Sequence, residues 1–123
     1  MTRTLRQKPS DIIKRELAKA KREKWEKMFE QQLRAEKLNF YREFRVAQDR
    51  RWRFDFHISN SPILIEIQGG TWSQGRHVRG KGYEHDIEKL ATAQLLGYRV
   101  FWGTPKHVKT GQLLRWVKEA LNS

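Results

Sequence analysis

The 123-residue chain has no cysteine and no long apolar run, and each absence excludes a class of protein. Without cysteine there is no disulfide framework, no zinc–cysteine site and no thiol nucleophile, which is compatible with a reducing compartment. The apolar runs are too short for a membrane span, and the N-terminus does not resemble a signal peptide. We therefore expect a soluble protein of the cytoplasm with no membrane partner.

Acidic residues are also scarce, because 14 Asp and Glu stand against 26 Lys and Arg, for a formal net charge of +12. A charge of this size favours a polyanionic partner such as nucleic acid, although it also fits a ribosomal or merely soluble basic protein. The length fits one small domain with a single core.

Proline and glycine are absent from a long stretch near the N-terminus, between Ser10 and Leu38. This stretch is rich in helix formers, which predicts a helix over residues 10–38 with Ser10 as its N-cap. Apolar residues recur at helical spacing from Trp25 onward, so the second half is expected to pack on the core. Residues 1–23 are then a basic arm that either follows a phosphate backbone or is a solvated helix face, and residues 24–123 form the domain.

Three stretches beyond this helix are predicted strands: residues 40–46 and 52–58 alternate in strand fashion, and residues 63–68 are apolar on both faces until Glu66, which indicates a central strand. In the second stretch the alternation predicts two faces, one formed by Trp52, Phe54, Phe56 and Ile58 and the other by Arg53, Asp55 and His57. Further on, we expect a helix over residues 83–96 that stops at Gly97, a strand at 98–103 and an amphipathic helix over 110–121. The order predicts an α/β fold with a mixed sheet flanked by helices.

Two carboxylates interrupt the apolar strands. If the second and third stretches form a tight hairpin centred on Asn60 and Ser61, Asp55 lies directly opposite Glu66, with Cβ atoms about 4.5 to 5.5 Å apart. Like charges at that distance destabilise a sheet, so a positive group is expected between them. Hard divalent cations such as Mg²⁺ take carboxylate ligands, and Gln68 falls on the same face as Glu66. Neutralisation of the pair by Arg53 or His57 is the alternative.

The residues around these carboxylates resemble a known family. "RFDF" followed by "LIEIQGG" is similar to the metal-binding core of the PD-(D/E)XK nuclease superfamily, with Asp55 at its aspartate and Glu66-Ile67-Gln68 at its (D/E)-X-K element. The longer run "REFRVAQDRRWRFDF", "IEIQGG", "GRHVRGKGYEHDIEK" and "GYRVF" resembles small phage and bacterial proteins of the very-short-patch-repair-like and VRR-NUC-like branches. The resemblance covers residues 24–104, and it places the protein in a bacterium or a phage-infected host cell.

The resemblance implies a restriction-endonuclease-like α-β-β-β-α-β core with a bound Mg²⁺, for which Mn²⁺ can substitute. The implied ligands are Asp55, Glu66 and the main-chain carbonyl of Ile67. A glutamate of the first helix often completes such sites, which nominates Glu26 or Glu30, with ordinary surface charge as the alternative for at least one of them. Glu43 is a further candidate if its strand pairs beside Asp55.

One position departs from the family pattern. Gln68 stands where the family usually has a lysine that helps to orient the attacking water, and glutamine offers hydrogen bonds without charge. Lys89, on the predicted helix that follows, either returns a positive charge to the site or forms a surface ion pair with Asp86.

The glycine-rich basic segment at residues 69–82 supplies further candidates. His77 is a candidate for phosphate contact or proton transfer, and a solvent-exposed loop histidine is the alternative. We expect phosphate contacts from Arg76, Arg79 and Lys81, and either base stacking or core cover from Trp72.

Together these features predict a divalent-metal-dependent DNA endonuclease that hydrolyses phosphodiester bonds. The alternative is a nucleic-acid-binding module with a catalytically decayed nuclease core. A structure-specific, resolvase-like homodimer would share the chemistry and differ in substrate.

Overall fold

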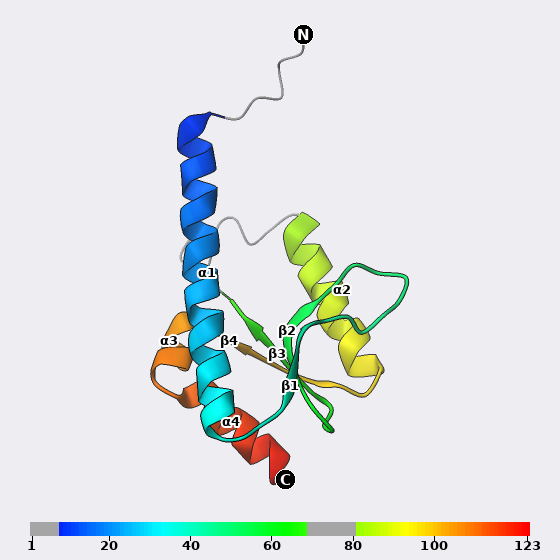
Figure 1. The fold of residues 1–123 in the computed structure, drawn as a ribbon. Helices are drawn as coiled ribbons and strands as arrows, with labels where there is room; N and C mark the ends of the chain where they lie inside the picture. Colours follow the sequence, from blue (N-terminus) through cyan, green and yellow to red (C-terminus); the bar gives the residue numbers. More distant parts are fainter. Residues whose placement is uncertain (1–7, 69–80) are drawn as a thin grey trace.

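A computed structural model describes residues 8–68 and 81–123 of the chain. In chain order, the elements are α1 (Pro9–Ala35), β1 (Phe40–Phe44), β2 (Phe54–Ile58), β3 (Ile63–Ile67), α2 (Lys81–Leu95), β4 (Arg99–Gly103), α3 (Pro105–Lys109) and α4 (Gln112–Leu121) (Figure 1). The predicted α/β fold with a mixed sheet flanked by helices is confirmed.

The long first helix is present, but its N-cap is Lys8 rather than Ser10. Pro9 occupies the first helical position, where its fixed φ fits and its missing N–H costs nothing, so the helix begins one residue before the expected cap. The second half of α1 buries Phe29 and Leu33, whereas Leu17 in the first half is 58% exposed. Figure 1 shows this first half projecting beyond the rest of the fold.

The four strands lie in the order β1-β2-β3-β4, with antiparallel pairs on either side of β2 and a parallel pair between β3 and β4. Phe56 pairs with Ile65 and His57 with Leu64. Continuing this register by one residue places Asp55 opposite Glu66, so the predicted hairpin register is confirmed.

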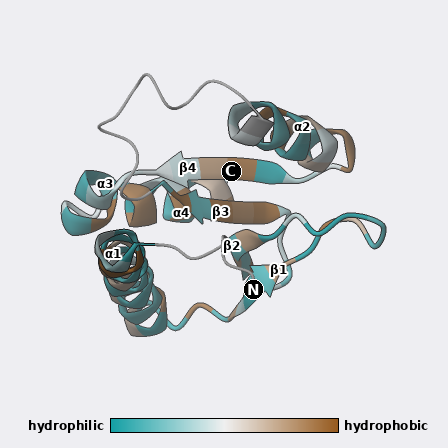
Figure 2. Cartoon of the chain, turned by 90° about the horizontal axis from the view of Figure 1, so that it is seen from above, coloured by the Kyte–Doolittle hydropathy of each residue, from teal (hydrophilic) through white to brown (hydrophobic). Residues whose placement is uncertain are grey.

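The sheet separates two apolar clusters, with α2 on one side and α1 on the other (Figure 2). The larger cluster packs α1, α3 and α4 onto residues of the sheet that include Phe56, Ile58, Ile63, Ile65 and Ile67. The smaller cluster lies under α2 and contains Phe54, Leu64 and Ala93.

The predicted shared face of Trp52, Phe54, Phe56 and Ile58 is therefore wrong, because Phe54 belongs to the smaller cluster and Trp52 precedes the strand. The neighbouring strand β1 changes face at the same point. Glu43 has φ of +54°, which interrupts the alternation of β1 beside Asp55. Phe44, the residue after Glu43, pairs with Phe54 and packs in the same smaller cluster.

The C-terminal segment differs from the expected single helix. Residues 105–121 form two helices, because Pro105 starts α3 and Gly111, with φ of +81°, separates it from α4. The Thr104 N–H donates to His107 Nδ1 at 2.9 Å and so satisfies the start of α3. The predicted stop of α2 at Gly97 is confirmed, with φ of +96°. Within the described ranges, no helix is both long and apolar enough to cross a membrane.

Candidate metal centre

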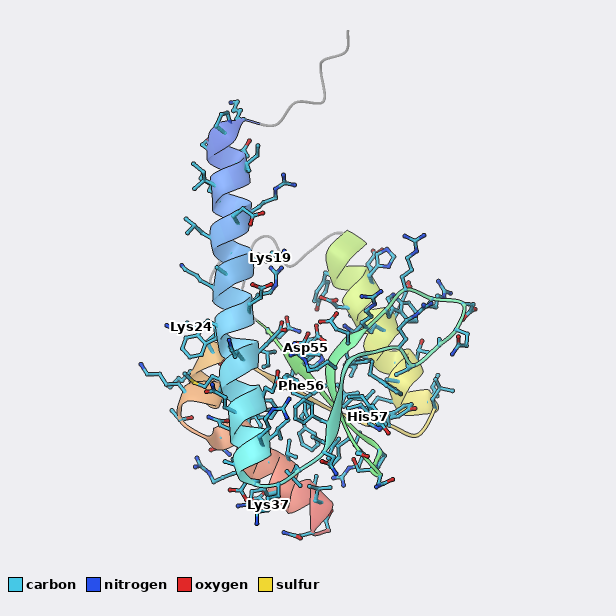
Figure 3. All side chains as sticks on the ribbon, viewed as in Figure 1. Lys19, Lys24, Lys37, Asp55, Phe56 and His57 are labelled. Carbon is cyan, nitrogen blue, oxygen red and sulfur yellow. The ribbon has the colours of Figure 1, made fainter. Side chains whose placement is uncertain are left out.

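Asp55 lies where β2 and β3 stop pairing. The last recorded pair on that side is Phe56 with Ile65, and beyond it the Ile67 N–H donates to Asp55 Oδ2 at 2.7 Å. The side chain thus accepts a bond that a strand carbonyl would otherwise accept, and its other carboxylate oxygen remains available. Figure 3 shows Asp55 in the region between α1 and α2 in this view.

Two further carboxylates converge on Asp55. Glu26 on α1 and Glu43 on β1 each bring one carboxylate oxygen to a point where these atoms and one from Asp55 all lie within 4.8 Å of one another. The register of β1 and β2 places Glu43 opposite Asp55, and its positive φ lies at this point. We call Glu26, Glu43 and Asp55 the acidic trio.

The trio is electrostatically unfavourable without a cation. Burial raises the pKa of Glu26 to about 7, and the negative charges of Asp55 and Glu43 act in the same direction against the attraction of Arg42. Burial also raises the pKa of Asp55, while the hydrogen bond from the Ile67 N–H opposes that rise. Hard oxygen donors with mutual repulsion fit a divalent cation such as Mg²⁺ or Mn²⁺.

Arg42 separates the roles of the two candidate glutamates of α1. Its Nη2 lies 2.6 Å from Glu26 Oε1, its Nη1 lies 2.9 Å from Glu30 Oε1, and its Nε donates to the Asp55 carbonyl at 3.2 Å. Glu30 also pairs with Arg34 at 2.7 Å, and that hydrogen bond lowers its pKa. Glu30 is thus held by two arginines, and Glu26 is the helix glutamate that joins the trio.

The sequence analysis missed Arg42, although a signal was available. Arg42 pairs with Phe56 in the register of β1 and β2, and its guanidinium lies 4.5 Å from the centre of the Phe56 ring. In the predicted strand it shares a period-two position with Phe40 and Phe44. A charged residue in an apolar row requires partners, and this one finds them on α1.

Glu66 lies beside the trio and pairs with a lysine of α2. Lys89 Nζ is 3.2 Å from Glu66 Oε1 and 4.5 Å from the centre of the Phe54 ring. Burial raises the pKa of Glu66 to about 8, repulsion from Asp55 adds to this, and attraction to Lys89 opposes it. Lys89 is only 8% exposed, so it is directed at the sheet and is not the surface partner of Asp86 that was the alternative.

The other predicted residues fall in three groups. Gln68 is half-buried at the end of β3, and its N–H donates to the Gly103 carbonyl at 2.7 Å. Of the two expected neutralising groups, Arg53 lies near the trio, with Nη1 3.7 Å from Glu43 Oε1, whereas the His57 ring bonds the Ser61 carbonyl in the β2–β3 turn. Outside the described residues lie Trp72, Arg76, His77, Arg79 and the side chain of Lys81.

Comparisons with known proteins support the fold. No protein-family model matches the chain. No curated protein matches it at a significant level. Among solved structures, the catalytic domain of the homing endonuclease I-Bth0305I is similar, with a TM-score of 0.58 and 18% sequence identity. The match covers 77% of this chain and 89% of that domain, so the two share a fold over most of their lengths.

Proposed function

We propose that this protein is a divalent-metal-dependent DNA endonuclease. The observation that carries the proposal is the acidic trio, in which Glu26, Glu43 and Asp55 converge from three elements of the fold. Two results support it: the fold resembles that of a homing endonuclease catalytic domain, and the net charge of +12 suits a polyanionic substrate. Arg42 holds Glu26 near Asp55, and metal ligands are commonly oriented by such neighbouring groups.

The trio is the set of side chains that would hold the metal. A divalent cation there would offset charge on the scissile phosphate and make a bound water more acidic. Asp55 is common to this set and to the one that the family resemblance implies, in which Glu66 and the Ile67 carbonyl are the other ligands. In the described geometry Glu66 instead pairs with Lys89, so we assign Glu66 and Lys89 to the adjacent wall of the site.

Lys89 takes the place of the lysine that Gln68 replaces. Its ammonium carries a positive charge into a buried position next to Glu66, and Gln68 follows Ile67 at the end of the same strand. We assign Lys89 to electrostatic stabilisation of the phosphate and Gln68 to hydrogen bonding of the attacking water or a phosphate oxygen.

The competing function is a DNA-binding module with a decayed nuclease core, and the specific observation behind it is Gln68 in place of the family lysine. Such a module would retain the basic surface and bind DNA without cutting it. The raised pKa values of Glu26 and Asp55 favour the enzyme, because holding these two partly buried carboxylates beside Glu43 has a stability cost that a binding module does not need.

The test is a cleavage assay on linear, nicked, mismatched and four-way DNA with Mg²⁺, Mn²⁺ or EDTA. Wild type is expected to cut at least one substrate in a metal-dependent way, and Glu43→Gln is expected to remove that activity. Glu36→Gln is the matched control, because Glu36 pairs with Lys118 on α4 and is not a member of the trio. Binding without cleavage across the panel, with gain of cleavage in Gln68→Lys, would establish the decayed module.

A further inference from the structure

The loop between β1 and β2 begins and ends at the acidic trio. Glu43 lies two residues before the loop segment 45–53, and Asp55 lies two residues after it. The segment reads "RVAQDRRWR", with four arginines and one acidic residue. Figure 1 shows it projecting away from the sheet, and Figure 2 shows its hydrophilic colouring. A polyanion bound at the trio would therefore meet a concentrated positive charge on this loop.

The loop is held in shape by one of its own arginines. Arg45 Nη2 donates to the carbonyls of Gln48 at 3.0 Å and Arg50 at 2.7 Å, and Arg45 Nε donates to the same Arg50 carbonyl at 3.2 Å. Val46 packs against the cluster under α2. These contacts replace the strand pairing that the loop lacks, so ordering it on binding costs less conformational entropy.

With Arg45 turned into the loop, Arg50 and Arg51 are its outward charges. Both are exposed, and no carboxylate of the described residues lies within ion-pair distance of either. The Arg50 guanidinium lies 4.9 Å from the centre of the Trp52 ring, which limits its freedom while leaving its N–H groups unused by carboxylates. Arginine in such a setting suits phosphate, because its planar fork can make two parallel hydrogen bonds.

We propose that the β1–β2 loop, braced by Arg45, is a phosphate clamp that binds the DNA backbone next to the candidate metal centre through Arg50 and Arg51. The proposal rests on the proposed function for the identity of the polyanion. Arg45 is a positioning residue of the clamp, because its donors are used within the loop. In sequence, the clamp at residues 45–53 is distinct from the basic segment at residues 69–82 and from the basic half of α1.

The test measures binding of a labelled DNA duplex in EDTA over a range of salt concentrations, so that cleavage does not enter the readout. Arg50→Gln/Arg51→Gln is compared with Arg99→Gln/Arg115→Gln, which removes the same charge from exposed arginines at the start of β4 and on α4. For the clamp variant, we expect affinity to fall by about tenfold or more near 0.1 M salt and the log–log salt slope to shrink by roughly 1.8, the value for two lost phosphate contacts.

A second variant tests the brace. Arg45→Ala should also weaken DNA binding. Adding Arg50→Gln/Arg51→Gln to Arg45→Ala should lower the DNA affinity by a smaller factor than the same pair does in wild type, because both changes act on one contact. Full additivity would show that Arg45 does not position the clamp.

The outcomes separate the two proposals. If the clamp variant and the control lose the same DNA affinity, the effect is one of net charge and the clamp proposal is overturned. The proposal is also overturned if the clamp variant binds DNA as tightly as wild type, or if wild type does not bind DNA. Cleavage of the same duplex with Mg²⁺ is measured in parallel. If the protein does not cut but the clamp variant alone loses affinity, the clamp stands and the nuclease proposal falls.

Discussion

The Arg42 guanidinium lies 2.6 Å from the Glu26 carboxylate, and this ion pair joins β1 to α1 at the edge of the acidic trio. The same guanidinium reaches Glu30 and the Asp55 carbonyl. It therefore orients a glutamate from a helix toward an aspartate on a strand, which no local sequence preference could do. The first prediction concerns this contact.

Arg42→Lys keeps the positive charge but loses the planar fork that reaches two glutamates at once. We expect a loss of about 1.5–3 kcal/mol in unfolding free energy, the range for hydrogen bonds to charged groups, and weaker metal binding. Chemical denaturation and a metal titration followed by melting temperature would measure both. Arg34→Lys, which changes one partner of Glu30 only, is the control. Metal affinity equal to wild type in Arg42→Lys would show that the contact is structural only.

Stability without metal should fall as pH rises. Glu26 and Glu66 have pKa values of about 7 and 8 in the folded protein against an ordinary value of 4.5, so the folded chain binds more protons than the unfolded chain between these limits. The free energy of unfolding therefore decreases as pH rises from 4.5 to about 8. Mg²⁺ or Mn²⁺ should raise the melting temperature more at pH 8 than at pH 5. An equal rise at both values would contradict a metal site in the trio.

Asp55→Asn should separate metal binding from folding. Asparagine removes the charge and keeps an oxygen that can accept the Ile67 N–H. We expect the metal-dependent rise in melting temperature to disappear and the metal-free protein at pH 8 to be more stable than wild type, because the repulsion with Glu26 and Glu66 is relieved. Cleavage should be lost as well. A retained metal response in this variant would place the ion elsewhere.

Glu26→Gln tests the helix member of the trio against a neighbour on the same helix. Glu23→Gln lies one turn earlier at an exposed position and is the matched control. We expect Glu26→Gln to weaken Mg²⁺ binding, so that a higher Mg²⁺ concentration is needed for the half-maximal cleavage rate. Glu23→Gln should need the same concentration as wild type. If the two variants require the same metal concentration, Glu26 is not a ligand.

Gln68 and Lys89 can be compared through paired substitutions. Gln68→Ala should slow cleavage by roughly 10²-fold, the scale for loss of one preorganised hydrogen-bond donor, and Gln68→Lys should retain or raise the rate. Lys89→Met should slow cleavage and leave Glu66 buried without its cation, which raises the pKa of Glu66 further. Lys106→Met on α3 is the control for loss of an exposed lysine. If Gln68→Ala cuts as fast as wild type and Lys89→Met does not, Gln68 is not needed for cleavage and the positive charge of Lys89 is.

Most elements of the fold, and the local geometry of the carboxylates on β2 and β3, follow from the sequence. Alternation at residues 52–58 and the apolar run at residues 63–68 predicted the two strands that the structure has at 54–58 and 63–67, and the short turn between them set the register that places Asp55 opposite Glu66. Both relations are encoded within a few residues, because strand period and turn length are local properties. The predicted alternation failed at Phe54, which packs with Phe44 in the smaller cluster, next to the backbone irregularity at Glu43.

Which distant residues join the site depends on the tertiary packing. Glu26 and Glu30 are equivalent by helical spacing, and the way α1 packs on the sheet through Phe29 and Leu33 directs Glu26 to the trio and Glu30 to Arg34 and Arg42. Lys89 and Asp86 are one turn apart on α2, yet packing of that helix over Phe54 turns Lys89 to Glu66. Such choices depend on how helices cross the sheet, and that crossing is set by the fit of side chains from remote segments.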